Sequence, residues 1–133
     1  MVTLGTPTPA MPTQDHDRAL AFYEGVLGFE RSVVEPGFAL LRRDSATLTL
    51  WGATDESWQS RDDWSRPVCS GAESFIAGTA SFRLEVDGIE ELYAGCRNHL
   101  HPNATLHETE WGTREFGVLD PDGNLIGFWE RLA

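Results

Sequence analysis

The sequence contains no lysine and only two cysteines, and each shortage narrows the possible functions. All ten basic residues among the 133 are arginines, against 21 acidic residues, so the formal net charge is -11. A field of that sign repels nucleic acids and anionic membranes and attracts cations. Cys69 and Cys96 do not form a CxxC pair. This argues against a disulfide framework or a zinc site and favours a reducing compartment.

Long hydrophobic runs are absent as well. No apolar stretch approaches the roughly 20 residues that a membrane-spanning helix needs. Residues 1–11 carry no basic residue and no apolar core of the kind found in signal peptides. We therefore expect a cytoplasmic protein that binds neither nucleic acid nor membranes. With 41% apolar and 23% charged residues, the chain is long enough for one domain with a hydrophobic core.

The most informative feature that is present is an internal repeat. Residues 38–51 align without gaps on residues 116–129. The identical pairs are Phe38/Phe116, Leu41/Leu119, Asp44/Asp122 and Trp51/Trp129. Each segment reads as strand, turn, strand, and the second contains the strong turn sequence Asp-Pro-Asp-Gly-Asn.

The segments around each hairpin match too. Residues 17–24 have apolar residues at helical spacing after an N-cap aspartate, and residues 88–99 form the counterpart. Apolar and β-favouring runs predict a strand before and after each helix. These four strands are Leu4 to Ala10, Phe29 to Val34, Ala80 to Val86 and Thr105 to Trp111.

These elements predict an α+β fold and a single domain, residues 1–133, made of two paired β-α-β-β-β modules. The modules span about residues 1–52 and 79–133, and their sheets are expected to curl around a cleft. The connecting segment, residues 53–78, is long for a compact domain and contains Trp58, Trp64 and Phe75. These aromatic residues either dock the segment onto the body or line and cap the cleft, and the sequence leaves both alternatives open.

The pattern resembles the vicinal oxygen chelate superfamily, which includes glyoxalase I, extradiol dioxygenases, fosfomycin-resistance enzymes and bleomycin-resistance proteins. The residues that carry the resemblance are Asp17-Arg18, Phe22-Tyr23, Leu27-Gly28-Phe29 and Asp120-Pro121-Asp122-Gly123-Asn124. They extend over nearly the whole chain. Because these motifs encode turns and packing, they imply the fold and not the activity.

The resemblance also implies where a metal would bind. Enzymes of the superfamily hold a divalent metal through one His or Glu on each of four cleft-facing strands. The corresponding residues here are Thr8, Thr49, Ser81 and Gly127. None of them holds a divalent transition metal with useful affinity. We therefore expect no metal, no cofactor and no catalytic residue; the alternative is a lyase, isomerase or dioxygenase with a displaced or metal-free site.

Within the superfamily the chain most resembles the bleomycin-resistance proteins. These are non-catalytic dimers that sequester a metal-chelated, cationic glycopeptide drug in clefts between subunits. Gly37-Phe38-Ala39 resembles the segment whose Phe stacks on the drug, and Trp111-Gly112 with Arg114-Glu115-Phe116 resembles the run whose Trp forms another wall of that pocket. Thr8-Pro9 resembles the segment at which that group exchanges its first strand between subunits.

The resemblance and the strand parity together imply a ligand site. Its residues are Phe38, Trp111, Gly112, Trp51, Thr49 and Trp129. The alternatives are a core position for Phe38, a packed strand end for Trp111, and space filling for the other two tryptophans. The predicted function is sequestration, by a homodimer, of a flat, cationic antibiotic of the bleomycin type. Besides the enzymes named above, the alternative is a binding protein for another aromatic metabolite.

Overall fold

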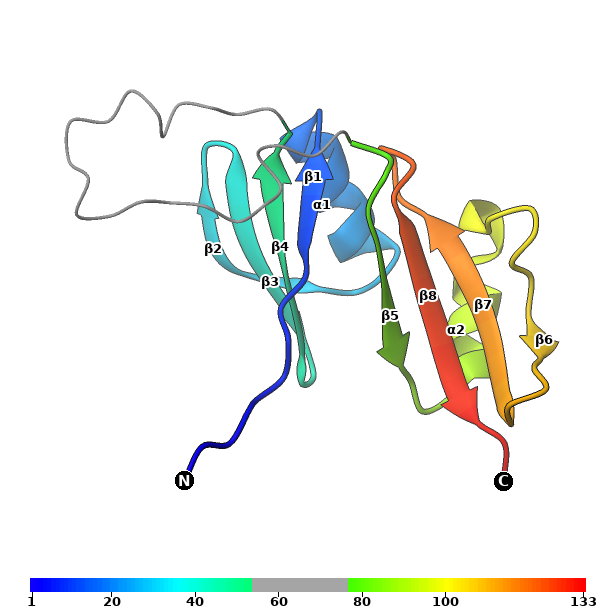
Figure 1. The fold of residues 1–133 in the computed structure, drawn as a ribbon. Helices are drawn as coiled ribbons and strands as arrows, with labels where there is room; N and C mark the ends of the chain where they lie inside the picture. The colour runs from blue at the N-terminus through cyan, green and yellow to red at the C-terminus, as the bar shows by residue number, and fades with distance from the viewer. Residues whose placement is uncertain (54–76) are drawn as a thin grey trace.

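The computed structural model describes residues 1–53 and 77–133 as two four-stranded mixed sheets, each with a helix on one face (Figure 1). This confirms the predicted α+β fold of two β-α-β-β-β modules, and the sheets are curled but not closed. Predictions about the connecting segment, including its three aromatic residues, lie outside the described residues. In the described parts, no helix has the length and apolar character that a membrane crossing requires.

Both modules have the same strand order, so the repeat in the sequence is also a repeat in the structure. The first sheet has the order β1-β4-β3-β2 and the second β5-β8-β7-β6, and in each the first pair is parallel. The elements of module 1 are β1 (Ala10–Thr13), α1 (His16–Gly25), β2 (Glu30–Glu35), β3 (Phe38–Arg43) and β4 (Ala46–Gly52). Those of module 2 are β5 (Ser81–Glu85), α2 (Ile89–Gly95), the 3-10 helix η3 (Arg97–His99), β6 (His107–Glu108), β7 (Thr113–Leu119) and β8 (Leu125–Arg131).

Alternation along the strands gives each sheet a core face, which is covered by a helix, and an open face. The residues on the core faces are almost fully buried. They include Ala39, Leu41, Leu48 and Leu50 in the first sheet and Phe116, Val118, Ile126 and Phe128 in the second. The open faces therefore carry the alternating residues of β3, β4, β7 and β8.

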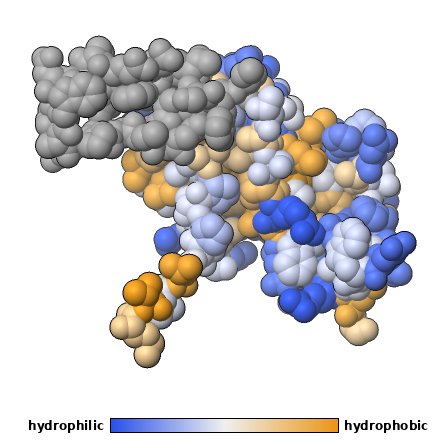
Figure 2. Space-filling view, viewed as in Figure 1, coloured by the Kyte–Doolittle hydropathy of each residue, from blue (hydrophilic) through white to orange (hydrophobic). Residues whose placement is uncertain are grey.

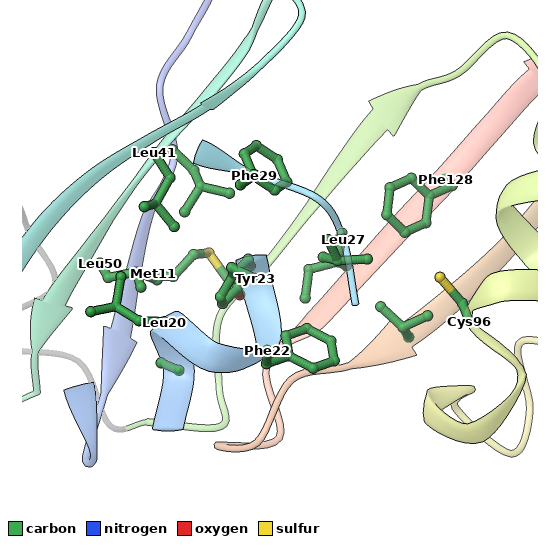
Figure 3. Close-up of a cluster of buried hydrophobic side chains, with 14 of the residues drawn as sticks. Met11, Leu20, Phe22, Tyr23, Leu27, Phe29, Leu41, Leu50, Cys96 and Phe128 are labelled. Carbon is green, nitrogen blue, oxygen red and sulfur yellow. The ribbon is translucent and has the colours of Figure 1, made fainter. Parts of the chain in front are cut away.

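Helix α1 joins the cores of the two modules. In Figure 3, Leu20 lies toward Leu50 and Met11 of the first sheet, whereas Phe22 lies on the side of Phe128 and Cys96. The ring of Phe22 also meets that of His99 at a centroid distance of 5.3 Å. Because α1 buries side chains toward both sheets, the modules pair within one chain on the side that carries the helices.

The turn at 120–124 fastens the two modules together through a buried hydrogen-bond network. The Asn124 amide donates to the Pro12 carbonyl at 2.9 Å and to Asp120 Oδ2 at 3.0 Å, and its Oδ1 accepts from the amides of Gly78 and Ala80. Tyr23 Oη donates to Asp120 Oδ2 at 2.8 Å. Burial, with the nearby Asp120 carboxylate, raises the pKa of Tyr23 well above its usual value, so the phenol remains a donor.

The first strand was predicted too early in the chain. It begins at Ala10 rather than at Leu4, and Leu4 is 89% exposed. The strand is defined by its pairing with β4, where Ala10 lies opposite Thr49, and by Met11 and Thr13, which are buried against the core. Pro12 is accommodated because β1 lies at the edge of its sheet.

The strand predicted at residues 105–111 is also much shorter, since β6 contains only His107 and Glu108. A turn over residues 109–113 replaces the rest. The Thr109 amide donates to the Thr113 carbonyl at 2.8 Å, and the Thr113 amide donates to Thr109 Oγ1 at 3.2 Å. Gly112 has a φ of 85°, a conformation that suits glycine and ends the extended run.

We expect Asn124→Ala to lower the free energy of unfolding by roughly 2–4 kcal/mol, because it leaves buried backbone groups of both modules without partners. Chemical denaturation followed by circular dichroism measures this change. Asn98→Ala, at an exposed asparagine in η3, is the matched control and should change stability by less than about 0.5 kcal/mol. Equal effects of the two substitutions would contradict the role assigned to the turn.

Candidate ligand-binding site

The predicted site residues lie on the open faces of two different sheets or beside them. Phe38, Thr49 and Trp51 alternate with the buried residues of β3 and β4, which places them on the open face of the first sheet. Trp129 alternates with buried Phe128 on β8 in the same way. Trp111 and Gly112 belong to the turn before β7 and lie outside any strand.

The first group is a half-buried aromatic pair. Phe38 lies opposite Trp51 in the β3–β4 register, and their rings meet edge to face at 4.7 Å between centroids. Leu40, opposite Thr49, and Val33, opposite Leu40, extend this surface across the sheet. Phe38 is therefore on the face away from the core, so the alternative of a core position does not hold. The Thr49 side chain is less free, because its hydroxyl donates to the Pro9 carbonyl at 3.3 Å.

The second group centres on an exposed tryptophan whose indole nitrogen is hydrogen-bonded. Trp111 is 70% exposed, so it is not the packed strand end that the alternative required. Its Nε1 donates to Glu115 Oε2 at 2.9 Å. The same carboxylate accepts from Thr113 Oγ1 at 2.5 Å, and Arg83 Nη2 lies 2.7 Å from its other oxygen. An exposed ring that is fixed at its nitrogen is oriented in advance for contact with a ligand.

Glu115 holds these donors as a carboxylate. Burial alone would raise its pKa, but the hydrogen bonds from Thr113, Trp111 and Arg83 outweigh that effect and lower the pKa. The group therefore remains ionised at neutral pH. Three donors on one carboxylate fix the position of Trp111 relative to the sheet.

Trp129 completes the second group between two arginines. The guanidinium carbons of Arg83 and Arg131 lie 5.9 and 5.8 Å from the centre of its ring, within the range of cation–π contact. A cavity of about 360 Å³ is lined by Arg83, Trp111, Gly112, Thr113, Trp129, Arg131 and Leu132. Figure 2 is viewed from the side of the open faces. The surface over module 2 is predominantly hydrophilic, whereas orange apolar patches lie on the visible part of module 1 and at the N-terminal residues.

The two groups do not meet within one chain. No ring contact, cation–π contact or hydrogen bond links Phe38 or Trp51 to Trp111 or Trp129 in residues 1–53 and 77–133. The structure thus brings the six predicted residues together as two sets, one on each sheet. Each set offers a flat aromatic surface, and the second also offers charged hydrogen-bonding groups.

Comparison with known proteins places this arrangement in a family. Residues 6–128 match the model of the glyoxalase/bleomycin resistance protein/dioxygenase superfamily. The chain belongs to this superfamily. Proteins named bleomycin resistance protein from Geobacillus stearothermophilus and Staphylococcus aureus are 48% identical to it over 126 residues, which cover 93% of this chain and 95% of theirs.

Solved structures of the superfamily share the fold. A bleomycin-binding protein complexed with bleomycin has a TM-score of 0.67 at 23% identity and covers 96% of this chain and 99% of its own. The bleomycin-binding protein from Streptomyces verticillus, complexed with copper(II)-bleomycin, has a TM-score of 0.70 at 24% identity, with coverages of 96% and 97%. A lactoylglutathione lyase from Agrobacterium tumefaciens reaches 0.75 at 21% identity, covering 96% of this chain and 94% of its own.

The side chains at the superfamily's metal positions do not fit a divalent metal here. Thr8 precedes β1, and the residue that lies across the ladder from Thr49 is Ala10. The residue across from Gly127 is Arg83, two positions after Ser81. Neither the predicted residues nor these ladder partners include a His or a carboxylate, and no three potential ligands cluster within the described ranges.

Sequence reasoning did not select Glu115 or Arg83 as part of the site. Both lie on the open face of the second sheet, because Glu115 pairs with Trp129 and Arg83 with Gly127 in the ladder. Their contact depends on the parallel β5–β8 register, which the sequence does not specify.

Replacing Glu115 with Ala should release Trp111. In an NMR spectrum of indole N–H groups, the Trp111 signal, assigned by its loss in Trp111→Phe, should shift and exchange faster with water. In the unmodified protein it should stay constant as the pH falls toward the usual glutamate value of 4.5 and change only below it, because the pKa of Glu115 is lowered. The hydrogen bonds to the Glu115 carboxylate stabilise the fold at neutral pH. The free energy of unfolding should therefore fall in the same acidic range, as Glu115 becomes protonated.

Glu108→Ala is the control for this experiment, since Glu108 is an exposed residue of β6 without a contact to Trp111. Its Trp111 signal should match that of the unmodified protein. An unchanged signal in Glu115→Ala would show that the carboxylate does not position the indole.

Proposed function

We propose that this protein binds and sequesters a flat, cationic antibiotic of the bleomycin type without altering it chemically, and thereby confers resistance. The relatives named bleomycin resistance protein, at 48% identity over nearly the whole chain, support this proposal. We place this function in the cytoplasm, where the free, buried Cys96 would remain reduced.

The observation that carries the proposal is the state of Trp111. Its large apolar ring is 70% exposed, and covering it with a ligand would remove this apolar surface from water, which is favourable. The hydrogen bond to Glu115 prevents the ring from folding back onto the protein. Trp129, Phe38 and Trp51 supply further flat surfaces. We propose Thr49 and Gly112 as neighbouring site residues that leave room for the ligand, since neither carries a bulky side chain.

Charge acts on such a ligand mainly at long range. The arginines near Trp129 are matched by carboxylates, with Arg83 at 2.7 Å from Glu115 and Arg131 at 3.8 Å from Glu85. The cavity at Trp129 is therefore close to neutral. The net charge of -11 instead attracts a cation toward the protein as a whole.

A homodimer would bring the two aromatic groups together. We propose that the open face of the first sheet in one copy faces that of the second sheet in another, so that Phe38 and the partner's Trp111 enclose one ligand. The exposed apolar residues of module 1 support this arrangement, because Val33 is 43% exposed on that face and Met1, Val2 and Leu4 project from the body (Figure 1). The segment around Pro9 would then lie at the interface.

Trp111→Ala should weaken binding of metal-loaded bleomycin by about thirtyfold, or about 2 kcal/mol, because one stacking face and its apolar area are lost. The melting temperature should hardly change, since the ring is mostly exposed. Phe38→Ala should weaken binding similarly, with a small loss of stability from its contact with Trp51. Tryptophan fluorescence titration and thermal unfolding measure the two effects.

Val34→Ala is the control for this pair, because Val34 lies opposite Ala39 on the other face of the sheet. Its affinity should equal that of the unmodified protein. Absence of drug binding by the unmodified protein would overturn the bleomycin proposal, and binding of an unrelated flat metabolite would then favour the broader alternative.

The dimer is tested with two neighbouring valines of similar exposure. Light scattering should give about twice the chain mass of 14.8 kDa. Val33→Asp should dissociate the dimer, because Val33 lies on the open face at 43% exposure, whereas Val34→Asp, at 41% exposure on the other face, should not. A monomeric unmodified protein at micromolar concentration would contradict the proposed interface.

A further inference from the structure

A second cavity lies between the two modules on the side that carries the helices. Its volume is about 510 Å³, within the size range of pockets that bind small organic molecules. Its apolar walls include Leu27, Phe29, Leu84, Leu92 and Phe128. None of the six residues proposed for drug binding lines it. The cavity is therefore separate from the site proposed on the open faces.

The internal repeat explains why the cavity exists. The two modules contact each other on the side that carries the helices, and we call this contact the seam. One hairpin turn lies at each end of the seam (Figure 1). At one end the turn at 120–124 is fastened to the β1–α1 connection by Asn124 and Asp122. At the other end the equivalent turn faces residues 84–88, and the repeat places Ala46 where the second module has Asn124.

The consequence of that difference is an open end. The side-chain amide of Asn124 makes four hydrogen bonds, which the methyl group of Ala46 cannot replace. In the described parts of the chain, no hydrogen bond links residues 43–46 to residues 84–88. Arg43 does not fill the gap, because its Nη1 donates to the Leu27 carbonyl at 2.7 Å. The Arg43 side chain also lies close to Gly28. A Cβ at position 28 would be only 3.1 Å from Arg43 Nη1.

The mouth of the cavity is acidic. Four carboxylate residues line it, Asp44, Glu85, Asp87 and Glu91, against the single basic residue Arg43. Arg43 Nε lies 3.9 Å from Asp44, and Glu85 has Arg131 at 3.8 Å. Asp87 and Glu91 form no ion pair with another described residue. The lining thus combines an apolar floor with an excess of negative charge.

We propose that this cavity is a second binding site, for a small amphipathic organic cation with an apolar ring or chain and an ammonium group. The apolar body is removed from water against the leucines and Phe128, and the ammonium stays at the mouth near Asp87 and Glu91. A metal ion does not fit the lining, because in residues 1–53 and 77–133 no three candidate ligands converge. An anion of the same shape is repelled.

Three naphthalene probes of the same ring and different charge test this site. Naphthylmethylammonium should bind about three- to tenfold more tightly than neutral naphthylmethanol, and naphthoate should bind more weakly than both. Amide-resolved NMR gives each dissociation constant and locates the contact. The largest shifts should fall on Leu84, Gly88 and Leu92, and not on the turn at 109–113.

Variants separate charge recognition from general attraction to an acidic protein. Asp87→Asn combined with Glu91→Gln should abolish the preference for the ammonium probe over the alcohol. Glu90→Gln, with the same change in net charge per substitution but at a residue outside the lining, should keep the preference. Ala46→Phe should weaken all three probes by filling the cavity, and Trp111→Ala should leave them unchanged.

Several results would overturn the proposal. One is equal affinity for the three probes, and another is no binding up to millimolar concentration. A third is loss of probe binding in Trp111→Ala, which would assign the contact to the open face. If Ala46→Phe does not fold, the paired comparison of the double variant with Glu90→Gln decides the question alone.

Discussion

The arrangement of the whole molecule depends on the buried hydrogen-bond network of Asp120 and Asn124. One asparagine side chain holds Pro12 of the first module, the chain entering β5, and Asp120 of its own turn. Tyr23 adds α1 through its hydroxyl. Because every polar atom of the Asn124 amide has a partner in an interior of low dielectric, the network tolerates little displacement. It therefore fixes the position of one sheet relative to the other, and with it the directions in which both open faces point.

The fastening is one-sided, and this follows from how the two halves of the sequence have diverged. The apolar positions of the hairpins are kept in both modules, so both sheets form with the same strand order. Two turn residues of the fastening network are not kept, since Arg42 and Ala46 stand where the second module has Asp120 and Asn124, although Asp44 matches Asp122. Packing thus determines that the modules pair, and the polar turn residues determine at which end they pair tightly.

The sequence predicted the parts of the fold that local patterns encode. The hairpins were placed within about three residues because apolar alternation and turn residues act over short distances. The first strand was wrong because its bounds come from pairing with β4, far along the chain, and not from residues 4–9 themselves. Strand parity put Trp51 on the same face as Thr49 and Trp129 on the same face as Gly127, and in the structure these are the open faces. The Glu115–Arg83 contact required the β5–β8 register.

The distribution of charge gives the net charge and the aromatic rings different effects on ligand binding, the first on arrival and the second on residence. At physiological ionic strength, fields are screened over about 8 Å, so the charge of -11 influences how often a cation arrives more than how long it stays. Residence then depends on the rings and on how rigidly they are held. Trp111 is held by a carboxylate whose own charge is neutralised by Arg83, so the protein keeps an acidic exterior without placing an uncompensated charge beside the aromatic surface. That separation would allow the flat, cationic ligand proposed above to be attracted by its charge and retained by its shape.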